Sequence, residues 1–197
     1  MAASLRDRKK AATMHRIQEI AVDMFEHRSF DAVRIEQIAE AAEVSPSTIY
    51  RYFGTKEGLV LQDEHDDVLR DSLADAFTEH NLWAVADQAL ALIEHDHFTR
   101  DAEMTLRRTK LWFDNPTLRA ASFPVVDTWI DELTTMVLDS PHHDFEPDEA
   151  RIVVASLIWG LVTAIESWYR GGADGSLGAY LRRMIAAVRK ALGADLE

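Results

Sequence analysis

Helical periodicity runs through nearly the whole chain and leaves little room for β-strands. Apolar residues recur every three or four positions, and the one Asp-Gly pair, Asp174-Gly175, lies between two helical patterns rather than two alternating ones. The pattern predicts an all-α fold of about nine helices. A chain of 197 residues with 47% apolar side chains can bury a sizeable core, as one domain or as a small domain plus a larger one.

The expected helices divide into an N-terminal group of short helices and a C-terminal group of long ones. In the first group we expect a helix from about Ser4 or Arg6 to His27 and two short helices. In the second group the helices are longer, and Pro and Gly residues mark most of their ends. We therefore predict two domains, residues 1–54 and 55–197, with helices after the first one over 34–41, 46–53, 55–79, 82–95, 98–114, 116–139, 148–170 and 176–192.

The third expected helix has a clear start signal. Ser45 suits the N-cap position, and Pro46 suits the first helical position, where its missing N–H group costs nothing. Only a few residues separate this helix from the one over 34–41, so the pair is a helix-turn-helix candidate. Spacing alone is a weak signal, because any all-helical protein contains similar turns.

The charge is distributed unevenly along the chain. The formal net charge is −13. Residues 1–60 hold nine basic and nine acidic side chains, whereas residues 61–197 hold 12 basic and 25 acidic ones. This balance argues against wholesale coating of nucleic acid or membrane, but not against a small basic site. A basic N-terminal tip is either a DNA-backbone contact or a frayed, solvated terminus; it contains Arg6, Arg8, Lys9 and Lys10.

Several chemistries require residues or segments that the sequence lacks. The chain contains no cysteine, which excludes a disulfide, a thiolate zinc site and a Cys nucleophile. The polar, basic start does not resemble a signal peptide. The longest apolar run, Ile152–Ile165, is interrupted by polar residues and is shorter than the ~20 residues that a bilayer requires. We therefore expect a soluble, cytoplasmic protein with no membrane partner.

The run from Val44 to Glu57, VSPSTIYRYFGTKE, combines a helix cap, two tyrosines, a phenylalanine and a lysine in order. With its surroundings, residues 15–60, it resembles the DNA-binding domain of the TetR family of bacterial transcriptional regulators. The remainder of the chain agrees with the family only in length and helical character. The residues that carry the resemblance are Ala21, Phe25, Phe30, Asp31, Ala32, Ile38, Ala39, Ala42, Val44, Ser45, Thr48, Ile49, Tyr50, Tyr52, Phe53, Lys56, Glu57 and Leu59.

Three positions depart from the family pattern. Ser29 and Glu43 stand where the family usually has glycine, and Arg34 stands where it usually has threonine. Arg34 adds a basic group near the DNA but loses a hydroxyl cap. We expect Glu43 to adopt a left-handed turn at a cost of roughly 1 kcal/mol. These changes leave the fold prediction intact and affect the operator sequence.

The resemblance and the local physics both indicate DNA contacts around the third helix. Its first N–H groups and positive dipole end can face a phosphate or a groove. Arg51 is the long bidentate donor on this helix, and guanine is its natural partner. Tyr50, Tyr52 and Lys56 suit phosphate contacts, which position the duplex; core packing is the alternative for the tyrosines. The full predicted DNA-binding set is Arg34, Ser45, Pro46, Ser47, Thr48, Tyr50, Arg51, Tyr52 and Lys56.

In this family, the C-terminal part resembles a dimeric ligand-binding domain. A single helix-turn-helix contacts only a few base pairs, so a two-fold dimer with recognition helices ~34 Å apart is the usual solution. We predict a homodimer through the helices over 148–170 and 176–192, because they carry more apolar surface than one chain needs; an ordinary monomer core is the alternative. The last helix shows a clean apolar stripe of Leu177, Tyr180, Leu181, Met184, Ile185, Val188 and Leu192.

The middle helices are rich in large aromatic side chains, which line ligand pockets as well as protein cores. We predict that a small, largely apolar effector binds there, although core packing is the alternative for each residue taken singly. A buried arginine would need an acidic partner or an acidic ligand; a solvated helix face is the alternative for Arg107 and Arg108. The predicted pocket contains Met104, Arg108, Trp112, Trp129, Trp159 and Thr163.

Two other classes of function remain open. Glu94-x-x-His97 has the spacing of one half of a di-iron motif, but the second half is missing. His95, His97, His142 and His143 suit exposed loops better than a metal site, so we expect no metal and no cofactor. An all-helical ligand-binding or enzymatic bundle, or a structural adaptor, would not need the capped helix and its Tyr-Arg-Tyr-Phe run. We therefore predict a sequence-specific, DNA-binding repressor, not an enzyme, that a ligand releases from double-stranded operator DNA.

Overall fold

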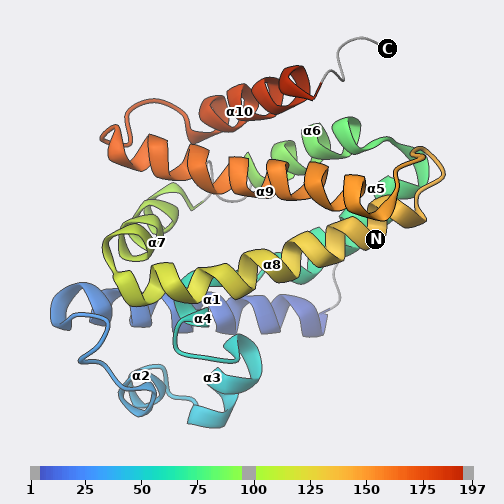
Figure 1. Cartoon of the computed structure of the whole chain (residues 1–197). Helices are drawn as coiled ribbons and strands as arrows, with labels where there is room; N and C mark the ends of the chain where they lie inside the picture. Colours follow the sequence, from blue (N-terminus) through green and yellow to red (C-terminus); the bar gives the residue numbers. More distant parts are fainter. Residues whose placement is uncertain (1–4, 95–100, 193–197) are drawn as a thin grey trace. The chain divides into compact units, whose positions relative to one another are not determined.

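The computed structural model describes residues 5–94 and 101–192 (Figure 1). Within these ranges the chain forms ten α-helices and no strand, which confirms the all-α prediction and adds one helix to the expected nine. The chain divides into two compact units. Unit 1 comprises Met1–Asp67 and Lys110–Ser122, and unit 2 comprises Val68–Thr109 and Phe123–Glu197. Unit 1 thus reaches beyond residue 54, at which we placed the functional domain boundary.

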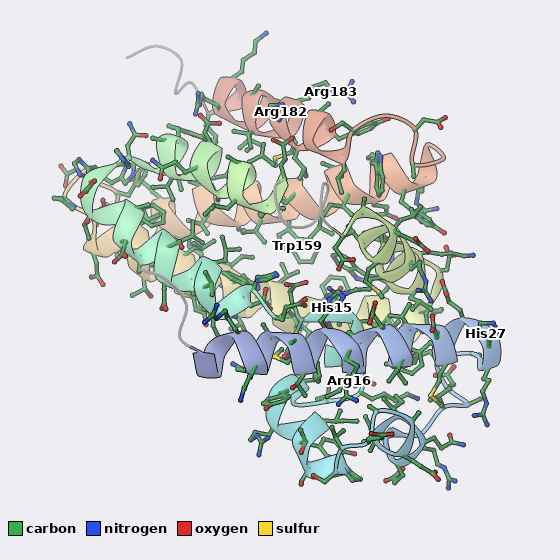
Figure 2. All side chains as sticks on the ribbon, turned by 180° about the vertical axis from the view of Figure 1, so that it is seen from behind. His15, Arg16, His27, Trp159, Arg182 and Arg183 are labelled. Carbon is green, nitrogen blue, oxygen red and sulfur yellow. The ribbon has the colours of Figure 1, made fainter. Side chains whose placement is uncertain are left out.

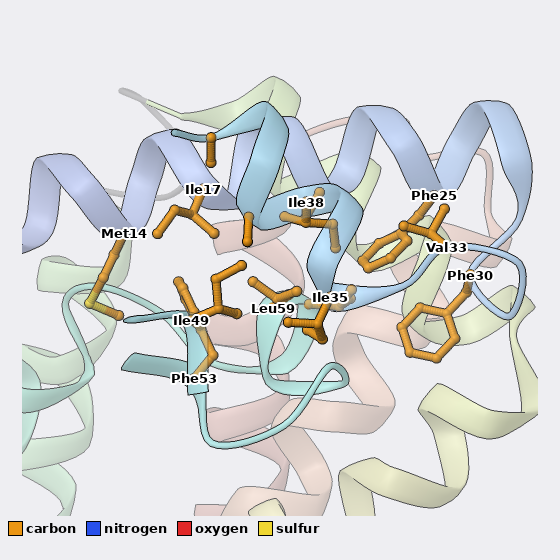
Figure 3. Close-up of a cluster of buried hydrophobic side chains, with 14 of the residues drawn as sticks. Met14, Ile17, Phe25, Phe30, Val33, Ile35, Ile38, Ile49, Phe53 and Leu59 are labelled. Atoms are coloured by element: carbon orange, nitrogen blue, oxygen red, sulfur yellow. The ribbon is translucent and has the colours of Figure 1, made fainter. Parts of the chain in front are cut away.

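Unit 1 is built on α1 (Leu5–Arg28), α2 (Ile35–Ala41) and α3 (Pro46–Phe53), close to the expected ranges. Their inward side chains form one core (Figure 3). Phe25 and Phe30 lie with ring centroids 4.9 Å apart at the bend after α1. Leu118, from the segment 110–122, completes the same core. The fully buried large side chains of this core are Ile17, Phe25, Ile38, Ile49, Phe53, Leu59 and Leu118.

Two departures from the family pattern lie at strained backbone positions. Ser29 has a φ of 66° in the loop after α1, and Glu43 has a φ of 51° in the turn between α2 and α3. Positive φ is costly for any residue with a Cβ, so these are positions where glycine fits without strain. The left-handed conformation expected of Glu43 is confirmed.

The prediction of one continuous helix over 55–79 is wrong, because residues 62–65 separate two helices there. α4 covers only Gly58–Leu61, and α5 begins at Asp66 and ends at Glu79. Gly58 starts α4 so close to α3 that a Cβ would lie 2.0 Å from the Phe53 carbonyl oxygen. The buried Gln18 amide then donates to the carbonyls of Leu59 (3.3 Å) and Gln62 (2.8 Å). A long-range side chain thus takes a carbonyl that a continuous helix would bond internally, which local periodicity cannot reveal.

Unit 2 contains most of α5, α7 and α8, together with the whole of α6, α9 and α10. Its helices are α6 (Leu82–Ile93), α7 (Ala102–Asp114), α8 (Pro116–Asp139), α9 (Pro147–Arg170) and α10 (Leu177–Ala191). The ends differ from the expected ones by a few residues, and His95 and His97 lie outside the described residues. α7 and α8 cross the division, because residues 110–122 belong to unit 1.

The last two helices pack against each other within the chain (Figure 1). The α10 stripe is used for this contact, since Leu177, Leu181 and Ile185 are buried with Ala164 and Trp168 of α9. Gly160 of α9 lies so close to α10 that a Cβ there would be 2.7 Å from Met184 Sδ. The stripe that we assigned to a dimer interface therefore forms part of the core of the single chain.

α9 is unusual because it is apolar but sparsely covered. By length and composition alone, α9 could cross a membrane, but the core helix of a soluble protein passes the same test. From the shorter run Ile152–Ile165 we expected no such helix. Only 22% of the most apolar window of α9 is buried in the single chain. Ile152 is 62% exposed. The helix therefore carries apolar side chains that unit 2 covers only in part, and Ile152 is the most exposed of them.

Candidate nucleic-acid interface

The start of α3 is organised by a single hydroxyl group. Ser45 Oγ accepts a hydrogen bond from the Thr48 N–H at 3.2 Å, which is the predicted N-cap. The same oxygen lies 2.8 Å from Ser47 Oγ and 2.9 Å from Thr48 Oγ1. Pro46 occupies the first helical position. The three hydroxyls and the helix N-terminus thus form one polar surface that suits a phosphate oxygen.

α3 has two different sides. Ile49 and Phe53 are fully buried in the core of unit 1 (Figure 3). Tyr50 is 50% exposed, and Ser47 and Arg51 are exposed as well. A short helix that is fixed on one side and polar on the other is suited to enter a DNA groove.

Arg51 is held by its neighbour in sequence. Its guanidinium carbon lies 4.8 Å above the centroid of the Tyr52 ring, an arrangement in which the ring face attracts the cation. Tyr52 itself is half-buried against the core of unit 1. The Tyr52 ring thus packs inward and supports the arginine, and its contact with phosphate stays a prediction.

Lys56 is engaged within the protein. Its amino group donates to the Phe30 carbonyl and lies 4.3 Å from the centroid of the Phe30 ring. Burial lowers the pKa of Lys56 below its usual value, and nearby Asp31 and Glu57 offset this in part. Lys56 therefore ties the loop after α1 to the α3–α4 turn, and the phosphate contact stays a prediction.

Arg34 stands at the start of α2 and provides no side-chain cap. Its backbone N–H donates to Gln37 Oε1 at 3.0 Å. The glutamine thus supplies its half of a capping box, although Arg34 has no hydroxyl to supply the other half. The exposed Arg34 side chain is left available for the contact that we predict with DNA.

The basic tip at the start of α1 is only partly organised by the protein. Lys10 pairs with Asp67 at 2.7 Å, whereas Arg8 and Lys9 are exposed. The side chain of Arg6 lies outside the described residues. Whether this tip follows a DNA backbone stays a prediction.

Comparison with known proteins agrees with this arrangement. The family model "Bacterial regulatory proteins, tetR family" matches residues 17–62, which contain α2, α3 and α4. A second model, "MftR C-terminal domain", matches residues 80–193 and thus more than half of the chain. The chain belongs to the TetR family of bacterial transcriptional regulators. As a TetR-family member it is a DNA-binding transcriptional regulator.

Curated TetR-family relatives cover the chain to different extents. A protein described as a mycofactocin biosynthesis transcriptional regulator, MftR, from Mycobacterium tuberculosis is 25% identical over 96% of this chain and 94% of its own. The HTH-type transcriptional regulator TcmR from Streptomyces glaucescens is 39% identical, but over only 29% of this chain and 25% of its own. The higher identity is thus confined to a short stretch.

Solved structures of similar fold include two kinds of TetR-type repressor. NalD, the secondary repressor of the MexAB-OprM multidrug efflux pump in Pseudomonas aeruginosa, has a TM-score of 0.56 at 17% identity and covers 93% of this chain and 96% of its own. Thermus thermophilus FadR, in complex with lauroyl-CoA, has a TM-score of 0.54 at 18% identity, with coverages of 89% and 92%. At this identity the likeness establishes the shared fold.

The predicted ligand-binding residues belong to both units. Met104 is buried and Trp129 half-buried in unit 2, whereas Trp112 belongs to unit 1 and packs against its core. Thr163 is exposed, and its hydroxyl donates to the Trp159 carbonyl at 2.8 Å. Trp159 pairs with Phe123, with ring centroids 5.3 Å apart. Arg108 is half-buried.

Sequence reasoning missed Arg70, one of the arginines of unit 2 that lie over an aromatic ring. Its guanidinium carbon lies 4.3 Å from the centroid of Trp129, and its Nε donates to Glu132 at 2.7 Å. We had considered Arg107 and Arg108 for such a position. Arg70 and Trp129 are far apart in sequence, so no local pattern could have paired them.

Proposed function

We propose that the protein is a homodimeric repressor that binds double-stranded operator DNA through α3 and is released by a small, largely apolar ligand. The observation that carries the DNA-binding part is the surface of α3, where Ser47, Tyr50 and Arg51 are exposed while Ile49 and Phe53 are buried. NalD, which shares the fold, is described as a repressor, and this supports repression.

The DNA-binding proposal is tested on DNA that flanks the gene. Purified protein is titrated into labelled duplexes, and binding is followed by gel retardation or fluorescence anisotropy. Arg51→Ala should weaken the best duplex by roughly 1–3 kcal/mol and relax one base position. If Arg51→Ala bound every operator variant as tightly as the parent protein does, Arg51 would not contact a base. If the parent protein bound no duplex, the alternative of a helical bundle that does not bind DNA would be favoured.

Lys56 provides the matched comparison. A lysine that contacts phosphate weakens all sequences alike when it is removed and lowers the slope of affinity against salt by roughly one. A lysine that only holds the Phe30 loop weakens binding with the slope unchanged. Lys56→Ala therefore distinguishes the predicted phosphate contact from the intramolecular contact that the structure shows.

The effector site is proposed within unit 2, around Met104, Trp129 and Trp159, and Trp112 is omitted because it belongs to unit 1. FadR, which shares the fold, is bound to lauroyl-CoA and, in the Bacillus subtilis protein, to stearoyl-CoA, so an apolar ligand is chemically reasonable. Tryptophan fluorescence titrations with and without operator should give affinities that differ by an equivalent of about 1–3 kcal/mol.

The dimer is proposed to form through the exposed face of α9 together with α10. Along α9, the hydroxyls of Ser156, Thr163 and Ser167 each donate to the carbonyl four residues earlier, so they do not require water. Phe123, 56% exposed, extends the same surface beside Trp159. An apolar surface of this kind is covered in a stable dimer. A regulator that works on the chromosome acts in the cytoplasm, and we propose no enzymatic activity.

A further inference from the structure

The residues between α4 and α5 bring together side chains of types that bind metal ions. Donor atoms of Asp63, Glu64 and His65 all lie within 4.8 Å of one another. Among the described residues, this is the one group of three or more carboxylate and imidazole side chains whose donor atoms lie so close together. All three side chains are half-buried rather than fully solvated.

The interruption of the helix is what makes this convergence possible. In a continuous helix over 55–79, successive side chains would point about 100° apart, and three neighbours in sequence could not face one point. The chain instead turns at Gln62, which has an extended backbone. Asp63 then accepts from the His65 N–H, and the Asp63 N–H donates to Asp66, each at 3.0 Å. The helix break and the cluster are therefore one feature.

A second helix holds the cluster from the other side. His15 Nδ1 of α1 lies 2.9 Å from Glu64 Oε1, and His65 Nε2 lies 4.0 Å from the same oxygen. The Glu64 side chain is only 9% exposed. Ligand atoms at ~2.0–2.2 Å from a tetrahedral zinc ion lie about 3.3 Å from each other, so the three side chains would close in on the ion from separations of at most 4.8 Å. His15 fixes the carboxylate that would bind the ion.

We propose that Asp63, Glu64 and His65 bind a divalent transition-metal ion such as Zn²⁺, with His15 as a positioning residue for Glu64. Imidazole with carboxylate oxygens suits zinc, whereas Mg²⁺ prefers oxygen ligands and water. A hydrogen bond from outside the ligand set commonly raises metal affinity by 10–100-fold, which is the role of His15. The bound ion stabilises the interrupted form of α4–α5 over a continuous helix, because only the interrupted form presents three ligands.

The test is calorimetric titration of the full chain with Zn²⁺ alone, with Mg²⁺ as the control ion. We expect one Zn²⁺ to bind per chain at this site. Glu64→Gln and His65→Gln should lower the affinity by at least about 100-fold, and His15→Ala by about 10–100-fold. His27→Gln is the matched control, because His27 lies at the C-terminal end of α1, away from His15 near the middle of the helix (Figure 2), and its Nδ1 bonds to the Asp23 carbonyl. It should leave the affinity unchanged.

A second measurement keeps the test decisive if a variant folds poorly. Zn²⁺ should raise the melting temperature of the parent and of His27→Gln, but not of Asp63→Asn. The proposal is overturned if the parent does not bind Zn²⁺, or if Glu64→Gln and His65→Gln bind it as tightly as the parent.

Discussion

α3 and α9 have opposite relations to the single chain. α3 has eight residues, and its apolar side chains Ile49 and Phe53 are fully buried by unit 1. α9 has 24 residues, and only 22% of its most apolar window is fully buried, while most of the other apolar side chains there are half-buried. A short polar helix is thus complete within one chain, whereas the long apolar helix is not. The difference teaches that the exposed side of α3 is suited to DNA and the exposed side of α9 to another protein surface.

The same two units differ in how a helix start is held. The Ser45 hydroxyl caps α3 and does not titrate near neutral pH. In unit 2, the Asn81 side chain caps α6, and His143 Nε2 accepts one further bond, from the Leu82 N–H at 2.7 Å. Only the neutral imidazole can accept this bond. The start of α3 should therefore be insensitive to mild acid, whereas the start of α6 should lose one hydrogen bond.

The largest expected effect is in the core of unit 1. Phe53→Ala should lower the free energy of unfolding by about 3–5 kcal/mol, because it opens a cavity around a fully buried ring. Urea denaturation measures the change. Tyr50→Ala on the exposed side of α3 is the control and should change stability by less than about 1 kcal/mol. Equal effects for the two variants would mean that α3 is not anchored on one side.

The next effect concerns the partly covered face of α9. Ile152→Glu should weaken the dimer by about 100-fold or more, because a carboxylate would be buried without a partner. The monomer should stay folded, since Ile152 is 62% exposed in the single chain. Sedimentation velocity measures the oligomeric state. Val68→Glu on α5, where the valine is 56% exposed, is the control. An unchanged dimer in Ile152→Glu would place the interface elsewhere.

The difference between the two helix starts gives a pH dependence. Burial, and then neighbouring His142, lowers the pKa of His143 below its ordinary value of 6.5. The unfolded chain therefore takes up this proton at a higher pH than the folded one. Its contribution is present above about pH 6.5 and is lost as pH falls through the lower pKa of the folded state.

The measurement is chemical unfolding of parent and His143→Gln at several pH values between 5 and 7.5. The parent should lose about 1 kcal/mol more than the variant over this range, the usual worth of one capping hydrogen bond. Parallel pH profiles would show that the imidazole does not hold α6.

The smallest effect sharpens the description of the turn before α3. Glu43→Gly should stabilise the protein by about 0.5–1 kcal/mol, because the φ of 51° suits glycine and strains glutamate. Glu40→Gly is the matched control, since exposed Glu40 lies within helical α2 and glycine there should destabilise by about 1 kcal/mol. Thermal unfolding measures both. A loss of stability in Glu43→Gly would mean that the glutamate side chain itself supports the turn.

The sequence by itself determined the local elements of this protein. The cap at Ser45, the proline after it and the spacing of Ile49 and Phe53 specify α3 through interactions within a few residues. Such interactions do not depend on the rest of the chain, so α2, α3 and the family were predictable. The left-handed turn at Glu43 was predictable from the resemblance, because the family usually has glycine at this position.

Only the tertiary structure decided which apolar faces meet and where a long helix breaks. The α10 stripe looked available for a partner, but Leu181 and Ile185 are buried against α9 of the same chain. The helix over 55–79 is interrupted because Gln18, more than 40 residues earlier, bonds the carbonyls of Leu59 and Gln62. Arg70 meets Trp129 across a similar distance in sequence. Periodicity records which side of a helix is apolar, but the partner of that side is set by contacts between distant residues.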